Sequence, residues 1–318
     1  MRELRRLTNY VNVSGFKSGL LLKITRDIKK FNKGVSGSKP GKRPTVLLVT
    51  MENAVEETVE RLFNMVASDD DIRNFTPAQV VKLVKECGEL SLADNDDIDI
   101  VIKYFANRTI TTDDLYSLID DMSDSGSDVI ALVFDYIKRI RPAERGKDEK
   151  EELKNITNEL KSLASHYEIP VITAHQLNRD AASTVDAAMQ ANKSDLARLL
   201  GRGQVGSAWE VIENADFACI INVEKKRSTG QYYLTFKRIK IRYRQATDMG
   251  YFNHPFDSNN RMRLVDDIGL DHSLSEDSLA TDFDAVNMNV KGKRNAKTRE
   301  EISTEDPFEF GTALNAKK

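Results

Sequence analysis

The stretch VIALVFDYIKRIR (Val129–Arg141) decides the fold. Residues 129–134 are all apolar, and an acid, Asp135, stands where this run stops. A short run of this kind is typical of a strand buried on both faces, as in a parallel sheet. An acid after such a strand lies at the edge where open α/β sheets bind ligands, and nucleotide-hydrolysing enzymes keep a Mg²⁺-holding carboxylate there. Taken alone, the segment fits a metal ligand and a solvated strand end equally well.

The segments on either side of this run alternate between strand and helix patterns. Strands are expected at 45–50, 98–105, 129–134 and 171–174, and helices at 55–67, 78–86, 112–122 and 151–167. An antiparallel pair is expected at 217–223 and 232–241, with further strands near 249–252 and 261–265. The predicted fold class is therefore α/β, a mostly parallel sheet flanked by helices, with antiparallel strands at its C-terminal end.

Composition and charge restrict the class of protein. The chain has 318 residues, of which 31% are charged, and no apolar run approaches the length of a membrane span. No signal peptide is expected, and Cys87 and Cys219 lie far apart without metal-ligand spacing, so a reducing, cytoplasmic location without a membrane or zinc is predicted. We expect one domain over 1–265 and a charged, mostly disordered tail over 266–318, where apolar periodicity fades.

Basic residues cluster in two parts of a chain whose formal net charge is -3. Twelve Lys or Arg residues fall within 1–43, and a second basic group runs from 225 to 244. Such groups fit contact with a polyanion and also fit a solvated face, and the sequence alone leaves both interpretations open.

The segment VSGFKSGL (Val13–Leu20) stands where a phosphate-binding loop is expected, directly before a helix pattern. In such a loop backbone N–H groups surround the phosphates, a lysine contacts them and a Ser or Thr binds Mg²⁺. Lys17 and Ser18 fit these roles, but Phe16 stands where Gly is expected and Gly15 lies one residue earlier. By itself the segment also fits an ordinary basic helix start.

Two other strand ends carry polar side chains. Glu52, after the strand at 45–50, fits a base that orients an attacking water, and also fits a helix-start Glu favoured by the macrodipole. Gln176, after the strand at 171–174, fits a hydrogen-bond donor to a γ-phosphate, or an ordinary polar loop, and the adjacent His175 is expected to be structural.

Cations alternate along the predicted strand at 232–241 and just beyond it. Arg238, Lys240, Arg242 and Arg244 share one parity, which predicts four cations on one face. Such a strand can face solvent, bind nucleic acid, or reach a neighbouring subunit's nucleotide as an arginine finger.

Taken in their order along the chain, these segments resemble the RecA-like, P-loop motor domain of the DnaB family of replicative DNA helicases, particularly the large-phage versions. IPVITAHQLNR (Ile169–Arg179) is similar to the family's Val-Pro-Val…Ser-Gln-Leu-Asn-Arg. Residues 50–53 resemble its Ser-(Leu/Met)-Glu-Met, residues 134–136 its Walker B strand end, and residues 240–242 its Lys-x-Arg. The resemblance covers roughly residues 7–265.

The resemblance implies ATP and Mg²⁺ as cofactors and a role for each candidate residue. ATP is expected to be bound by Gly15, Phe16, Lys17, Ser18 and Gly19, and Mg²⁺ by Ser18 and Asp135. Catalysis is expected to involve Glu52, Asp135, Gln176, Lys240 and Arg242. DNA phosphates are expected to contact Arg179, Lys193, Arg198 and Arg202.

The implied function is a DNA replication motor that hydrolyses ATP between the subunits of a ring and translocates 5′ to 3′ on single-stranded DNA. The implied partners are single-stranded DNA, further copies in a hexamer, and a primase, helicase loader or single-strand-binding protein; a phage-encoded form would act in the bacterial host cytoplasm. A RecA/RadA-type recombinase and a degenerate, non-hydrolysing accessory subunit of the replisome remain as alternatives. Phe16 supports the accessory subunit.

Overall fold

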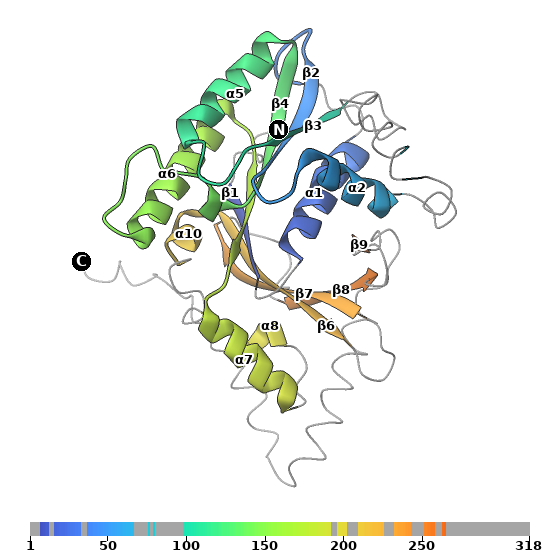
Figure 1. The fold of residues 1–318 in the computed structure, drawn as a ribbon, viewed down its shortest axis with the longest axis vertical. Helices are drawn as coiled ribbons and strands as arrows, with labels where there is room; N and C mark the ends of the chain where they lie inside the picture. The colour runs from blue at the N-terminus through green and yellow to red at the C-terminus, as the bar shows by residue number, and fades with distance from the viewer. Residues whose placement is uncertain are drawn as a thin grey trace, which may run out of the picture.

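The fold was obtained as a computed structural model, and its strands and helices are labelled in Figure 1. It describes residues 7–12, 16–32, 37–66, 76, 79, 98–191, 196–201, 209–225, 232–242, 251–257 and 263–264. The strands are β1 (Leu7–Asn12), β2 (Arg43–Thr50), β3 (Asp99–Tyr104), β4 (Ser127–Asp135), β5 (Val171–Gln176), β6 (Phe217–Lys225), β7 (Tyr232–Ile241), β8 (Tyr251–Asp257) and β9 (Arg263–Leu264). The helices are α1 (Lys17–Phe31), α2 (Val55–Val66), α5 (Thr112–Asp124), α6 (Glu149–Tyr167), α7 (Arg179–Gln190), α8 (Leu196–Leu199), α10 (Trp209–Asn214) and the 3₁₀ helix η1 (Ile137–Arg139).

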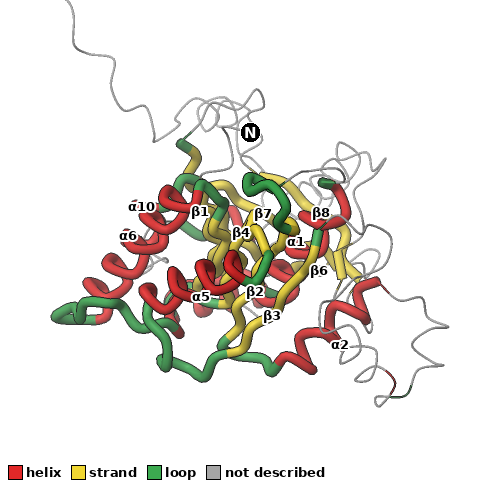
Figure 2. Tube along the Cα trace, turned by 90° about the horizontal axis from the view of Figure 1, so that it is seen from above, coloured by secondary structure: helices red, strands yellow, loops and turns green. Residues whose placement is uncertain are grey.

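All strands of the described residues join one sheet, in the order β3-β2-β4-β5-β1-β6-β7-β8-β9. Neighbours from β3 to β6 pair in parallel, and β7, β8 and β9 continue the sheet in antiparallel pairs. Helices α1 and α2 cover one face, and α5, α6 and α10 cover the other (Figures 1 and 2). The predicted α/β fold class is confirmed.

Strand β4 is buried on both faces, which accounts for its continuous apolar sequence. Leu132 and Phe134 belong to the core beneath α5 and α6, whereas Ala131 and Val133 belong to the core beneath α1 and α2. Each of these four side chains is at most 1% exposed. Alternate residues therefore point to opposite faces and both faces are covered, which is the condition that favours unbroken apolar strands.

Strand β1 and helix α7 are the longest described elements that were not predicted, the others being the short η1 and α8. Strand β1 was not predicted, because LTNYVN is polar, yet it occupies the centre of the sheet between β5 and β6. Helix α7 was not predicted either, since residues 178–206 are polar and rich in Ala. Asn178 caps α7 by accepting a hydrogen bond from the N–H of Ala181 at 3.0 Å, a start signal that the sequence does contain.

Some expectations fall on residues that the structure does not describe. The tail over 266–318 and nearly all of the helix predicted at 78–86 lie outside the described residues, and the boundary at residue 265 stays a prediction. Among the helices that are described, none has both the length and the apolar character that crossing a membrane requires.

The parallel part of the sheet brings four chain segments to one edge. The carboxyl ends of β1, β2, β4 and β5 all face this edge because these strands run in the same direction. The chain then enters α1, the turn before α2, η1 and α7 respectively. Open α/β sheets bind ligands at such an edge, so the segments that follow these strands form the candidate site.

Candidate active site

Helix α1 begins at the carboxyl edge with its first N–H groups available. Its first turn contains no acidic residue, and within the described residues no side chain caps it. The first N–H groups of a helix lack partners inside the helix and carry partial positive charge. This end of α1 can therefore bind an anion through the backbone, with the Lys17 ammonium group beside it.

Phe16, the residue at which the phosphate-loop pattern departs from Gly, is a core residue. It is 1% exposed and packs among side chains of α1, β6 and β7, namely Leu20, Cys219, Ile221, Leu234 and Phe236. A Cβ atom on Gly19 would lie only 2.3 Å from Cε2 of Phe16, so Gly19 leaves the space that the ring occupies. Phe16 and Gly19 thus form a matched pair that anchors the start of α1.

Asp135, the last residue of β4, has a buried carboxylate with one oxygen that accepts no hydrogen bond from the described residues. It is 3% exposed, and its Oδ1 has no hydrogen-bond partner within the part of the chain that the structure describes. Burial raises the pKa of Asp135, while a hydrogen bond with Ser18 and the charge of Lys17 act in the opposite direction. A buried carboxylate oxygen without a partner, beside a hydroxyl group, fits a hard cation such as Mg²⁺.

Glu52 lies in the bend between β2 and α2 and faces the same region. Its Oε1 accepts a hydrogen bond from Nη2 of Arg139, at 2.9 Å, and the two side chains are 29% and 35% exposed. After burial and the Ser18 hydrogen bond, the Glu52 charge is the next influence on the pKa of Asp135, which it raises. The structure therefore brings Lys17, Ser18, Glu52 and Asp135 together, and their roles stay predictions.

Tyr136, the buried residue after Asp135, lies between two cations of this region. The Nζ of Lys17 is 5.1 Å from the centroid of its ring, and the Cζ of Arg139 is 5.4 Å from it. Both distances fall in the range of cation–π attraction. The ring therefore links the start of α1 to the ion pair between Arg139 and Glu52.

His175 and Gln176 close β5 at the same edge in contrasting environments. His175 is buried, and its pKa is lowered to about 4 by burial and then by the charges of Lys138 and Lys17. It is therefore neutral at pH 7. Gln176 is exposed, so its amide is accessible from the carboxyl edge.

A pocket lies between the start of α1 and the ends of β2 and β4. Its lining combines apolar side chains of α1 and β2 with polar groups, and consists of Ser18, Leu21, Leu22, Leu48, Thr50, Asn53, Thr58 and Asp135. Asp135 and Ser18 thus share a cavity, which supports the fit of a cation and its ligand there.

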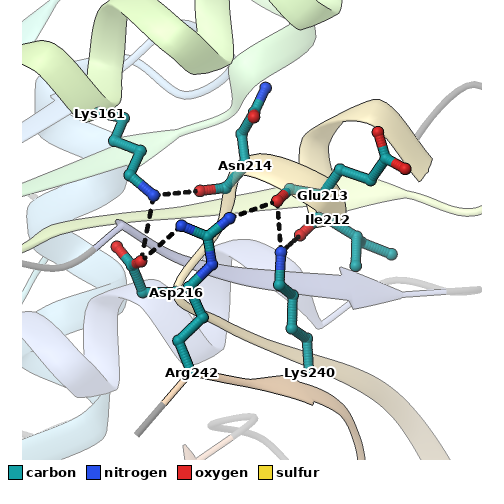
Figure 3. Close-up of polar contacts among 7 residues, drawn as sticks. All are labelled: Lys161, Ile212, Glu213, Asn214, Asp216, Lys240 and Arg242. Carbon is teal, nitrogen blue, oxygen red and sulfur yellow. Dashed lines mark hydrogen bonds and ion pairs between the residues drawn. The ribbon is translucent and has the colours of Figure 1, made fainter. Parts of the chain in front are cut away.

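Lys240 and Arg242 lie on the antiparallel side of the molecule, and both point toward the end of α10 (Figure 3). Arg242 donates from Nη2 to the carbonyl oxygen of Glu213 at 2.8 Å and from Nη1 to Oδ1 of Asp216 at 3.4 Å. Lys240 donates from Nζ to the carbonyl oxygen of Ile212 at 2.9 Å, and also to that of Glu213. In this structure both cationic groups are therefore engaged within their own chain.

A third cation completes this cluster at the end of α10. The Nζ of Lys161 donates to the carbonyl oxygen of Asn214 and to Oδ1 of Asp216, at 3.1 Å each. The last carbonyls of a helix carry partial negative charge and favour cations. Burial and the neighbouring charges of Arg242 and Lys161 lower the pKa of Lys240 to about 8. A role of Lys240 and Arg242 at a neighbour's nucleotide stays a prediction.

The residues predicted to contact DNA are only partly described. Arg179 is exposed at the start of α7, and Arg198 is exposed in α8, with its guanidinium 4.3 Å from the centroid of the Tyr251 ring. Lys193, Arg202 and the predicted phosphate-loop residue Gly15 lie outside the described residues.

Sequence reasoning missed the partners of the candidate residues. Arg139, which pairs with Glu52, stands four residues after Asp135 within the opening stretch, and its charge was the available signal. The contact of Asp216 with Arg242 joins residues 26 positions apart, and no sequence pattern predicts it.

Comparison with protein families gives a match over most of the chain. Residues 12–310 match the divergent DnaB-like ATPase family. The chain is 26% identical over 192 residues to the replicative DNA helicase DnaB of Mycoplasma pneumoniae, an alignment that covers 53% of this chain and 40% of that protein. The chain thus spans less than half the length of this relative.

Two solved structures share the fold. The ATPase domain of G40P superimposes with a TM-score of 0.58 at 15% identity, covering 82% of this chain and 84% of that one. A DnaB-like replicative helicase, from a structure that also reports its interactions with primase, gives a TM-score of 0.58 at 13% identity, covering 82% and 58%. The fold is therefore RecA-like, and because the family match extends over most of its length, the chain belongs to the divergent DnaB-like ATPases.

Proposed function

We propose that this chain is the ATP-hydrolysing motor of a replicative DNA helicase. One observation carries the proposal: Oδ1 of buried Asp135, which has no partner within the described residues, lies beside Ser18 and Lys17 at the start of α1, where no described side chain caps the helix. A buried carboxylate that retains an unpaired oxygen is costly unless a ligand or ion completes it. Membership in the DnaB-like ATPases supports ATP with Mg²⁺ as that ligand.

The residues of this edge fit MgATP. The N–H groups at the start of α1 and the Lys17 ammonium would hold the phosphates, and Ser18 and Asp135 would hold the metal. When bound, Mg²⁺ neutralises charge on the phosphates. Because the ring of Phe16 is buried against β6 and β7, its replacement of Gly is compatible with phosphate binding. This compatibility favours an active ATPase over a degenerate subunit.

Hydrolysis would use Glu52 as the base. Water adds to the γ-phosphorus as the bond to the β-phosphate oxygen breaks, giving ADP and phosphate, and Glu52 accepts a proton from the water. A positioned base contributes typically 10²–10⁴-fold to such a reaction. The exposed amide of Gln176, on the adjacent strand end, would hydrogen-bond the γ-phosphate.

The ring assembly is the part of the proposal that rests on family resemblance. Lys240 and Arg242 would reach the nucleotide of an adjacent subunit in a hexamer, and would exchange their contacts with α10 to do so. The exposed Arg179 and Arg198 would contact phosphates of single-stranded DNA, with translocation 5′ to 3′. A primase, helicase loader or single-strand-binding protein would be the further partner.

The proposal is tested by ATP turnover with and without single-stranded DNA. Wild type, Glu52→Gln and the matched control Glu60→Gln, an exposed Glu on α2, would be compared at several protein concentrations. We expect DNA to raise the wild-type rate, Glu52→Gln to reduce it by about 10²-fold or more, and Glu60→Gln to match wild type. A wild type that hydrolyses no ATP in any condition contradicts the proposal.

A further inference from the structure

We propose that Arg139 is the positioning residue for Glu52: it holds one carboxylate oxygen so that the other faces the attacking water. This inference rests on the proposed function, because it needs Glu52 to act as the base. It is carried by the hydrogen bond of 2.9 Å from Nη2 of Arg139 to Oε1 of Glu52, which joins residues 87 positions apart in the chain.

The backbone of Arg139 is fixed from both sides. Its N–H donates to the carbonyl oxygen of Tyr136 at 2.9 Å, and its carbonyl oxygen accepts from the N–H of Arg108 at 2.8 Å. The flanking residues Ile137 and Ile140 are 0% and 1% exposed and belong to the core beneath α5 and α6. A side chain that starts from an anchored backbone can orient its partner.

The side chain of Arg139 is held as well. Its guanidinium lies over the ring of buried Tyr136, with Cζ 5.4 Å from the ring centroid, and its Nε is buried. The guanidinium is planar and its donors have a fixed geometry, so holding the plane also fixes the direction of the bond to Glu52. Glu52 itself lies in a bend and lacks the support of a helix or strand, so it depends on such a contact.

Stability does not account for this ion pair. Both side chains are about one-third exposed, and pairs of that exposure contribute little to folding. Arg139 lies four residues from the candidate metal ligand Asp135 and contacts the same Tyr136 ring as Lys17. This arrangement resembles the general plan in which a third group orients the base that activates a nucleophile.

The test compares Arg139→Gln, Arg139→Lys and the control Lys138→Gln in the full chain. Lys138 is the adjacent residue of η1, and its ammonium pairs with Glu149 at 2.5 Å instead. We expect Arg139→Gln to lower kcat about tenfold with KM unchanged, Arg139→Lys to recover part of the loss, and Lys138→Gln to behave as wild type. Binding of a fluorescent ATP analogue is expected to have the same Kd in all four proteins.

A double-mutant cycle separates positioning from a general structural role. If Arg139 acts through Glu52, then Arg139→Gln adds no further loss in the Glu52→Gln background. An undiminished loss in that background, a changed Kd, or a kcat equal to wild type would overturn the inference. These results differ from failure of the proposed function, in which wild type hydrolyses no ATP or Glu52→Gln matches it.

Discussion

The carboxyl edge of the parallel strands and the antiparallel end of the same sheet handle their charged groups in opposite ways. At the carboxyl edge, Asp135 keeps a buried oxygen without a partner in the described residues, and α1 leaves its first N–H groups uncapped. At the antiparallel end, the cations Lys161, Lys240 and Arg242 all donate to α10 or to Asp216 (Figure 3). The first region thus keeps polar groups without partners among the described residues, whereas the three cations of the second region all have partners within the chain.

The largest effect is expected from Asp135→Asn. The amide keeps the shape of the side chain but removes the negative charge that would hold Mg²⁺, so ATP turnover is expected to fall about a thousandfold. Thermal unfolding is expected to show no loss of stability, because burial already disfavours the charged form of Asp135.

Asp128, at the opposite end of β4, provides the matched comparison for Asp135. It is also 3% exposed, but its Oδ2 accepts hydrogen bonds from Lys39 N–H at 3.0 Å and from Ser38 Oγ at 3.2 Å. Asp128→Asn is expected to lower the free energy of unfolding by about 1–3 kcal/mol while the turnover per folded molecule stays as in wild type. The reverse pattern, with Asp135 as the stabilising carboxylate, would contradict the assignment of the site.

Arg242→Ala is expected to lower ATP turnover by about a hundredfold or more, because a finger supplied by a neighbour stabilises charge on the γ-phosphate. Lys161→Gln is the control, since Lys161 donates to the same Asp216 oxygen and to α10. If Arg242 only supports α10, the two variants reduce turnover equally. A steady-state ATPase assay at matched protein concentration distinguishes these outcomes.

Gly19→Ala is expected to destabilise the start of α1 by about 2–3 kcal/mol, since the added methyl group would overlap the buried ring of Phe16. Urea unfolding gives the free energy of unfolding of Gly19→Ala, Phe16→Leu and the double variant. The double variant is expected to be more stable than the sum of the single effects predicts. Strict additivity would show that the ring and the glycine are not matched.

His175 predicts a smaller, pH-dependent effect at the carboxyl edge. Its folded pKa of about 4 lies below the unfolded value of about 6.5, so the unfolded chain binds the proton first as pH falls. Its contribution is therefore complete above about pH 6.5 and is lost toward pH 4. Between pH 7 and pH 5, the stability difference between wild type and His175→Gln is expected to narrow by about 2 kcal/mol. A constant difference in urea unfolding would contradict this.

Sequence patterns predicted the elements whose own residues dictate their structure. Burial gives β2, β4 and β5 their apolar runs and α6 its helical spacing of apolar residues, so these elements could be predicted. Because parallel strands end at the same edge of a sheet, the polar residues at their ends could also be predicted to lie near one another. β1 escaped prediction because its polar sequence becomes a strand through pairing with β5 and β6 on both sides. Tertiary pairing of this kind overrides local propensity.

The candidate site was likewise predictable where its residues belong to local sequence patterns. Lys17, Ser18, Glu52 and Asp135 each follow a recognisable strand end or begin a helix, and the fold brings them together. The bond from Arg139 to Glu52 depends on how η1 turns after β4, and local sequence does not specify that turn. The residues proposed to act directly were therefore easier to find than Arg139, the residue proposed to hold one of them.

Mixing two inactive variants tests whether the carboxyl edge of one chain and the antiparallel end of a neighbouring chain act on the same nucleotide. Glu52→Gln and Arg242→Ala would be mixed under conditions that allow subunits to exchange, and MgATP turnover measured against the ratio of the two. Our interpretation predicts that the mixture regains activity, because an Arg242→Ala subunit keeps Glu52 and meets an intact Arg242 on its neighbour. A mixture no more active than the two variants measured separately would contradict it.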